Sequence, residues 1–241
     1  MTSEACRYFC FKKTRGPIVS NDKDVDKIEL VAFDMDGVLV DDFSSWKTVH
    51  DYFNTSNEKS VDEYVKGKID DFEFIRRDAS LWKENGRPIT INKLSEILSN
   101  VHLMTGAKET IIFLKNSGVK TAIVSAGIDV LANKVSKELG IDYVFSNGVK
   151  CDENGFLTGE GILNVKLMYK DETIKRISKK EGIPLDKIAA VGNSCFDIPM
   201  LEISGLGIAF NPADECVSES ADIVVEGDDL SKIIPAIEKY L

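Results

Sequence analysis

Short apolar runs recur along the chain, and segments with helical periodicity separate several of them. These runs are residues 28–35, 119–125, 143–146, 188–192, 206–210 and 221–225. Continuous apolar runs are typical of strands that are covered on both faces. Because helices alternate with the strands, the pattern predicts an α/β fold with a doubly wound, Rossmann-like parallel sheet.

The segments between these strands contain the other predicted elements. Three predicted helices lie around residues 109–116, 131–139 and 172–181. Residues 229–241 predict a closing helix that Pro235 disturbs or restarts. Residues 146–161 contain an Asn-Gly pair and predict a β-hairpin before the next helix.

Residues 43–103 interrupt the alternation with three apolar stripes at helical spacing. The stripes are Trp46, Val49, His50 and Phe53; Phe72, Ile75, Ala79 and Trp82; and Leu94, Ile97, Leu98 and Val101. We therefore predict a helical cap domain at 43–103, inserted into a catalytic core made of 28–42 and 104–241. Residues 1–27 are rich in turn formers and predict a weakly ordered N-terminal tail.

Composition narrows the classes of function. The 241 residues are 43% hydrophobic and 29% charged, as in soluble globular proteins, and no apolar run is long enough to cross a bilayer. The first residues do not form a secretory signal, so we expect a cytoplasmic protein. The net charge of −10 argues against binding to nucleic acid or anionic lipid. Monomer and homodimer both remain open.

Polar residues follow several predicted strands at the point where each strand ends. They are Asp34 and Asp36, Ser125 to Gly127, and Asn193 with Asp197, while Lys170 opens the helix before the fourth strand. Because ligands bind at the carboxyl ends of strands in doubly wound sheets, these residues are expected to meet in one crevice.

This set of residue types suits phosphoryl transfer. A carboxylate can act as a nucleophile and form an aspartyl-phosphate. A second acid can protonate the leaving oxygen and then deprotonate water. Lysine and Mg²⁺ can offset the charge on the transferring group, while a hydroxyl and turn amides hold phosphate oxygens.

Four segments in order resemble the motifs of one family. DMDGV from Asp34, VSAG from Val124, Lys170 and GNSCFDIPML from Gly192 resemble motifs one to four of the haloacid dehalogenase-like (HAD) phosphatases. The resemblance runs from about residue 28 to the end and is strongest to the phosphoserine phosphatase branch. It implies a small phosphorylated substrate, Mg²⁺ as cofactor, and a cap after motif one.

The resemblance implies catalytic roles for three residues. Asp34 would be the nucleophile and a Mg²⁺ ligand, and Asp36 the general acid and base, with its backbone carbonyl also on the metal. Lys170 would stabilise charge, with Lys166 as an alternative one turn earlier.

The resemblance also implies binding roles. Ser125, Ala126 and Gly127 would hold the phosphate, and Asn193 and Asp197 would complete the metal site. Asn193 stands where the family usually has an acid, so we expect weaker metal affinity.

The residues that would recognise serine depart from the branch. Phe43 stands where that branch has an early-cap acid, and Arg76 or Arg77 is the candidate for its substrate-binding arginine, with Arg77 as the one we adopt. An ungapped register gives Asp78 at that place instead. We therefore expect a Mg²⁺-dependent phosphomonoester phosphatase for which phosphoserine is one candidate substrate. The alternatives are a weakened relative that binds a phosphorylated ligand or protein partner, and a phosphotransferase or mutase.

Overall fold

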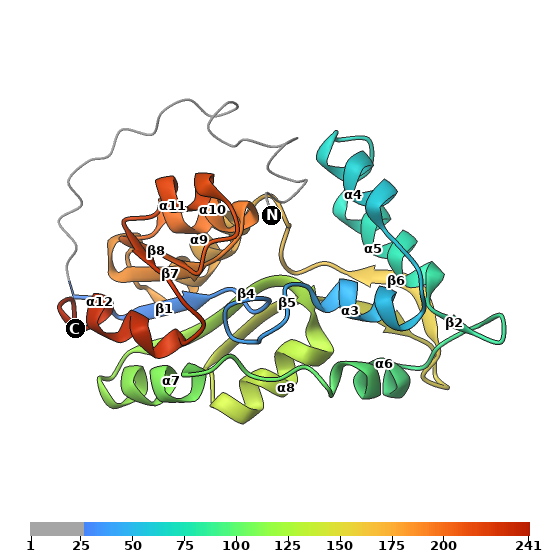
Figure 1. Ribbon diagram of the computed structural model, residues 1–241, viewed down its shortest axis with the longest axis horizontal. Coiled ribbons are helices and arrows are strands. Elements are labelled where there is room, and N and C mark those ends of the chain that lie inside the picture. The colour runs from blue at the N-terminus through green and yellow to red at the C-terminus, as the bar shows by residue number, and fades with distance from the viewer. Residues whose placement is uncertain (1–26) are drawn as a thin grey trace.

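A seven-stranded sheet forms the centre of the structure, a computed structural model that describes residues 27–241 (Figure 1). The strands are β1 (Leu30–Phe33), β4 (Lys120–Ile128), β5 (Tyr143–Cys151), β6 (Leu157–Ile162), β7 (Ile188–Gly192), β8 (Leu206–Phe210) and β9 (Ile223–Val225). Their order in the sheet is β6-β5-β4-β1-β7-β8-β9. Every neighbouring pair is parallel except β5 and β6, which form an antiparallel hairpin.

The central strand β1 is buried on both faces, which explains its continuous apolar sequence. Its residue Ala32 pairs with Ala122 of β4 on one side and with Ala190 of β7 on the other. Val31 and Phe33 enter one buried cluster, and Leu30 and Ala32 enter another. Successive side chains point to opposite faces of a strand, so these clusters lie on the two sides of the sheet.

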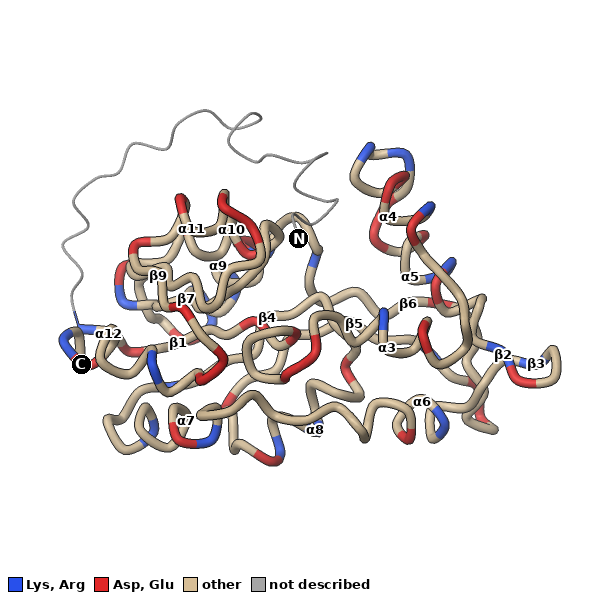
Figure 2. Tube along the Cα trace, viewed as in Figure 1, with Lys and Arg blue, Asp and Glu red and all other residues tan. Residues whose placement is uncertain are grey.

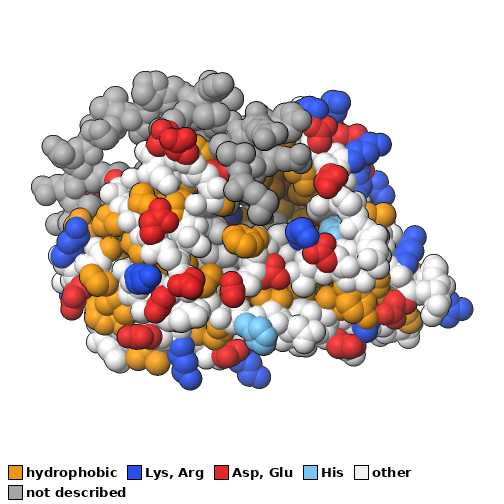
Figure 3. Space-filling model, in the orientation of Figure 1, with side chains coloured by type: hydrophobic (Ala, Val, Ile, Leu, Met, Phe, Trp, Pro, Cys, Tyr) orange, Lys and Arg blue, Asp and Glu red, His pale blue; other side chains and the backbone are white. Residues whose placement is uncertain are grey.

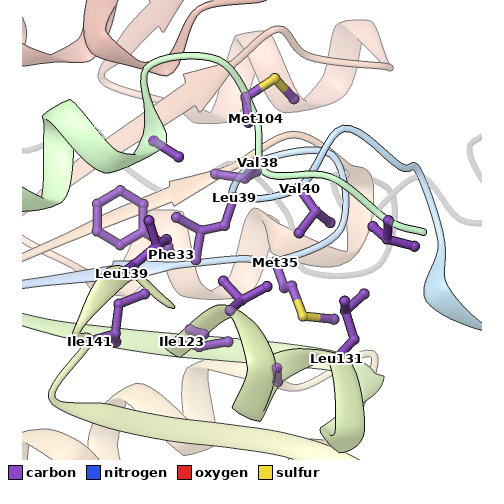
Figure 4. Packing of buried hydrophobic residues seen from close by; sticks show 14 of the residues in the cluster. Phe33, Met35, Val38, Leu39, Val40, Met104, Ile123, Leu131, Leu139 and Ile141 are labelled. Carbon is purple, nitrogen blue, oxygen red and sulfur yellow. The ribbon is translucent and has the colours of Figure 1, made fainter. Parts of the chain in front are cut away.

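Helices cover both faces. On one face lie α9 (Lys170–Glu181), α10 (Ile198–Ile203) and α11 (Glu215–Ser220), and on the other α7 (Ala107–Asn116), α8 (Asp129–Leu139) and α12 (Ile234–Glu238) (Figure 1). Figure 4 shows Phe33, Met35 and Leu39 packed with Ile123 and Leu131 in the second of these layers. The prediction of a doubly wound α/β sheet is confirmed.

Two predicted details also appear in the structure. The hairpin expected around residues 146–161 is β5 and β6, which make the sheet's antiparallel edge. A 3₁₀ helix at Leu230–Ile233 precedes α12, and Pro235 lies in the first turn of α12. Proline is tolerated there because the first turn's N–H groups have no partner inside the helix.

Residues 43–103, called the insert below, lie between β1 and α7. They form α3 (Ser45–Tyr52), α4 (Glu58–Val65), α5 (Asp71–Leu81), a hairpin of β2 (Lys83–Glu84) and β3 (Arg87–Pro88), and α6 (Ile91–Leu98). The insert stands beside the β6 edge of the sheet, and α5 packs against β6 (Figure 1). Val49, Ile75, Trp82 and Leu94 are buried as their stripes predict, whereas Phe72 is 53% exposed.

The boundaries of a separate cap domain stay a prediction. The expected N-terminal tail, residues 1–27, lies outside the described part of the chain except for Lys27. Among residues 27–241, none of the helices combines the length and apolarity that crossing a bilayer requires.

Candidate active site

Asp34 follows β1 directly and is 5% exposed. Its backbone N–H donates to the Val191 carbonyl of β7 at 2.9 Å, which holds it at the carboxyl end of the sheet. The Lys170 Nζ lies 2.8 Å from Asp34 Oδ1. Burial, followed by the charge of Asp197, raises the pKa of Asp34, and the Lys170 ammonium opposes that rise.

Asp36 lies two residues after Asp34, with one carboxylate oxygen held by the insert. Its Oδ2 accepts hydrogen bonds from the backbone N–H of Ser45 at 3.0 Å and from the Ser45 hydroxyl at 2.9 Å. Its Oδ1 is buried and has no hydrogen-bond partner among the described residues. Burial, together with the charge of Asp34, raises the pKa of Asp36 to about 7, although both bonds from Ser45 lower it. This acid can therefore give up or take a proton near neutral pH.

Two glycines allow the motifs to approach one another. Gly37 has a φ of +76°, and a Cβ there would lie 2.1 Å from Asn193 Nδ2. A Cβ on Gly127 would lie 2.7 Å from Asp36 Oδ2. A larger residue at either position would displace Asn193 or Asp36, so both glycines are needed for the close contact.

The segment from Ser125 to Gly127 lies in β4, where the pairing with β5 shifts register between Val124 and Ile128. Ser125 is buried, and its Oγ accepts a hydrogen bond from the Gly127 N–H at 3.1 Å. Trp46 of α3 donates from Nε1 to the Ala126 carbonyl at 3.0 Å. The insert thus holds this irregular carboxyl end of β4, which places the Ser125 hydroxyl on the same side of the site as Asp34 and Asp36.

Lys170, at the first residue of α9, bridges two acids. Its Nζ contacts Asp34 Oδ1 at 2.8 Å and Asp197 Oδ1 at 2.5 Å. Burial lowers the pKa of Lys170, but the charges of Asp197 and Asp34 outweigh it and raise that pKa. Lys166 is instead exposed and pairs with Glu172 at 3.0 Å, so Lys170 is the lysine that the structure brings to the site.

Asp197 uses both carboxylate oxygens within the protein. Its Oδ1 accepts from Lys170, and its Oδ2 accepts from the Asn193 N–H at 3.0 Å, the Ser194 N–H at 2.9 Å and the Ser194 hydroxyl at 3.0 Å. This arrangement holds the loop after β7 and orients Lys170. It does not support the predicted role of Asp197 as a metal ligand.

These groups open into a cavity of about 580 Å³ between the core and the insert. Asp34, Asp36, Ser125, Lys170 and Asn193 line its core side, and residues of α3, α4 and α5 line the other. Figure 3 shows the molecule hollowed between its two halves. The buried nucleophile candidate Asp34, a second acid, a lysine and a serine hydroxyl therefore line the same side of one cavity.

Comparison with known proteins agrees with this geometry. The family model of haloacid dehalogenase-like hydrolases matches residues 31–202. A phosphoserine phosphatase of Methanocaldococcus jannaschii is 36% identical over 222 residues, which are 88% of this chain and 99% of that protein. The chain belongs to the haloacid dehalogenase-like hydrolase family.

Solved structures of phosphoserine phosphatases are also similar to this chain. A phosphoserine phosphatase holding an analogue of its phospho-aspartyl intermediate matches with a TM-score of 0.74 and 33% identity, over 88% of this chain and 100% of that one. A substrate-bound phosphoserine phosphatase complex also has a TM-score of 0.74, at 32% identity over 88% and 99% of the two chains.

The donor atoms of this family member suit Mg²⁺ but are few. Two buried carboxylates, those of Asp34 and Asp197, share one lysine, and the buried Oδ1 of nearby Asp36 lacks a partner among the described residues. A cation would relieve this excess of buried negative charge. No group of three His, Cys, Asp or Glu side chains suited to a metal occurs within residues 27–241. The remaining oxygen donors are the Asp34 carboxylate, the Asn193 amide and the Asp36 carbonyl, and Mg²⁺ usually fills such an incomplete set with water.

The structure does not bring Arg77 to the cavity. On α5 its guanidinium bonds Glu73 at 2.7 Å and also pairs with Glu63, and Arg76 bonds Glu73 as well. Asp78, the next residue, is 2% exposed and lines the cavity. A substrate-binding role for Arg77 has no support from this arrangement.

Two further residues of the site were not predicted from the sequence. Ser45 binds Asp36, and its position directly after motif one is the only signal that could have singled it out. Asn147 of β5 accepts from the N–H groups of Asn164 and Val165, both at 2.9 Å, and donates to the Val165 carbonyl at 2.8 Å. This clamp fixes the segment that leads to Lys170; in the sequence, Asn147-Gly148 indicates only a turn.

Proposed function

We propose that the protein is a Mg²⁺-dependent phosphomonoester phosphatase that acts through an aspartyl-phosphate on a small phosphorylated metabolite. By its family and by its relatives at 30–36% identity, it is a phosphoric monoester hydrolase. One observation supports the finer mechanism most strongly: buried Asp34 contacts Lys170 at 2.8 Å, next to an acid whose pKa is about 7.

In the first step, a carboxylate oxygen of Asp34 attacks phosphorus and the bond from phosphorus to the substrate oxygen breaks. Asp36, in its protonated form, gives its proton to the departing alcohol. Lys170 and residues 125–127 at the end of β4 hold the phosphoryl oxygens while negative charge builds on them.

In the second step, Asp36 takes a proton from a water molecule. The oxygen of that water bonds to phosphorus, the bond between phosphorus and the Asp34 oxygen breaks, and inorganic phosphate leaves with Asp34 restored. Asp36 is protonated again, so each turnover consumes one water and leaves the enzyme unchanged.

Asp34, Asn193 and the Asp36 carbonyl would hold Mg²⁺. When bound, the ion supplies positive charge that offsets the charge on the phosphoryl group. The insert contributes Ser45 and Trp46, which bind Asp36 and Ala126 from the other side of the cavity. The protein's own contribution is thus a fixed position for Asp36 and for the end of β4.

The substrate is a small phosphomonoester, and the relatives' names make phosphoserine one candidate. The acidic charge of −10 argues against a nucleic-acid or anionic-membrane partner, and we propose a cytoplasmic location for the enzyme.

A catalytically weakened relative is the second candidate, and Asn193 is the observation that favours it. An amide provides an oxygen ligand but no negative charge, and Asp197, the nearest acid in that loop, is engaged by Lys170 and Ser194. Such a protein would retain phosphorylated ligands in the cavity and turn them over slowly.

Hydrolysis of a small aryl phosphate tests the proposal. We expect Mg²⁺-dependent release of phosphate that chelation abolishes and that Asp34→Asn reduces by at least about a thousandfold, because the amide is not a nucleophile. Asp41→Asn is the matched control, since Asp41 is exposed and does not line the cavity. Full activity of Asp34→Asn, or no hydrolysis by wild type with Mg²⁺, would contradict the proposed mechanism.

A further inference from the structure

The side of the cavity formed by the insert carries a buried polar cluster that the reaction does not use. Asp78 of α5 is 2% exposed, and its Oδ2 accepts a hydrogen bond from Asn57 Nδ2 at 2.8 Å. His50 of α3, also 2% exposed, has its Nε2 3.4 Å from the same oxygen, while its Nδ1 lies 2.8 Å from Thr55 Oγ1. All four residues line the cavity.

The second oxygen of this carboxylate is not satisfied by the described residues. Asp78 Oδ1 is buried and has no hydrogen-bond partner among the described residues. A buried carboxylate oxygen without a donor is unfavourable, so a structure retains one where something else supplies the donor. Because Asp78 faces the cavity, the donor would belong to the alcohol portion of the substrate.

The charge around the cavity favours a positively charged donor. Seven of its lining residues are Asp or Glu and two are Lys, with no Arg among those described. Lys170 is held by Asp34 and Asp197, and Lys47 pairs with Asp51 at 2.5 Å. Figure 2 shows acidic positions on the insert as well as on the core. No lysine or arginine without a carboxylate partner remains among the described lining residues to receive a carboxylate.

The aromatic content of the same side agrees with a cationic group. Trp46 and Phe43 line the cavity, and Phe43 is 76% exposed. The faces of aromatic rings attract ammonium groups but offer nothing to a carboxylate. The unpaired hydrogen-bond acceptor, the negative charge of the lining and the aromatic surface therefore all favour a positively charged group in the substrate.

We propose that the insert side of the cavity selects a phosphorylated amino alcohol that lacks a carboxylate, with its ammonium group donating to Asp78 Oδ1. This inference rests on the proposed phosphatase function and specifies its substrate class. Phosphoserine carries the same ammonium but adds a carboxylate, which would lie in this acidic environment without a positive partner. Asp78 is then the residue that determines specificity.

Three substrates of wild type test the proposal: phosphoethanolamine, phosphoserine and glycerol phosphate. The first two differ only by the carboxylate, and the third has hydroxyl donors without a positive charge. We expect kcat/KM for phosphoethanolamine to exceed that for each of the others by at least about tenfold. Equal or better turnover of phosphoserine or of glycerol phosphate would overturn the proposal.

The Asp78→Asn variant locates the selectivity. It keeps the shape of the side chain and removes its charge, so KM for phosphoethanolamine should rise by about tenfold. The ratio of kcat/KM for phosphoethanolamine to kcat/KM for phosphoserine should therefore decrease. Asp62→Asn is the control, because Asp62 lies on the same insert, outside the cavity, and pairs with Lys66. An unchanged preference in Asp78→Asn, or an equal change in Asp62→Asn, would contradict the role of Asp78.

Hydrolysis of the aryl phosphate distinguishes a failure of the proposed substrate class from a failure of the proposed phosphatase function. If wild type cleaves it in an Asp34-dependent manner but prefers phosphoserine, only the substrate class is wrong. If wild type does not cleave it, the phosphatase function fails, and the substrate class that rests on it fails too. If thermal unfolding shows that Asp78→Asn does not fold, the comparison of the three substrates on wild type still tests the proposed substrate class.

Discussion

The two sides of the cavity handle buried charge differently. On the core side, Asp34 and Asp197 share Lys170, and Asp197 accepts three further hydrogen bonds. On the insert side, Asp78 has two neighbours at one oxygen and none among the described residues at the other. The core side is arranged for a reaction common to many substrates, whereas the insert side is left incomplete until a particular ligand arrives.

This contrast predicts two kinds of variant. Changes on the core side should reduce turnover of every phosphomonoester, because all of them share the phosphoryl group. Changes to Asp78 on the insert side should alter the ranking of substrates and leave the chemistry intact. The variants below test the core side, beginning with the largest expected effect.

Asp36→Asn should have the largest effect. Its amide cannot donate a proton to the leaving alcohol, so turnover of an alkyl phosphate should fall by about 10²–10⁴-fold. An aryl phosphate should lose less, because a phenolate leaves without needing that proton. Steady-state rates on both substrates measure the difference. Equal losses on the two would show that Asp36 acts in some other way than as a general acid.

Lys170→Met should have the next largest effect and should also reduce stability. Without the ammonium, Asp34 and Asp197 are buried together uncompensated, which should cost about 3–5 kcal/mol in the free energy of unfolding. Loss of charge stabilisation should lower kcat by about 10²–10³-fold. Urea unfolding without added metal and steady-state kinetics measure the two effects.

The control for Lys170→Met is Lys166→Met. Lys166 is exposed and pairs only with Glu172 in the described structure, so this change should move the free energy of unfolding by no more than about 0.5 kcal/mol. Similar losses in the two variants would mean that the buried bridge from Lys170 to the two acids has no special role.

Asn193→Asp should have the smallest effect on activity, and it should strengthen Mg²⁺ binding where the other two variants reduce activity. A charged ligand should lower the Mg²⁺ concentration for half-maximal activity by about tenfold. Titration of activity with Mg²⁺ measures this, with Asn92→Asp on the exposed side of α6 as the control. A large gain in maximal rate would favour the weakened relative, and a loss would show that the asparagine belongs to a working site.

Much of the core could be predicted from the sequence because its signals are local. A buried parallel strand is a continuous apolar run, and the runs at 188–192 and 206–210 coincide with β7 and β8. Motif residues sit at strand ends, so the topology alone brings Asp34, Ser125 and Asn193 together. These strands and strand-end residues can therefore be predicted without knowing the contacts between distant parts of the chain.

The insert side could not be predicted in the same way. Adjacent residues on a helix point about 100° apart, so an error of one residue in register exchanges Arg77 for Asp78. Only the packing of α5 against β6 decides which of them faces the cavity. The partners of Asp197 are likewise set by where Lys170 and Ser194 lie in space, and the sequence contains no sign that both of its oxygens are occupied.

Trapping the phosphorylated enzyme tests the central claim most directly. Wild type turning over an aryl phosphate with Mg²⁺ would be quenched in acid, digested and examined by mass spectrometry for phosphorylated peptides. The account predicts an acid-stable, base-labile phosphate on Asp34, absent from Asp34→Asn and present in Asp41→Asn. Phosphate on a different residue during active turnover would contradict it.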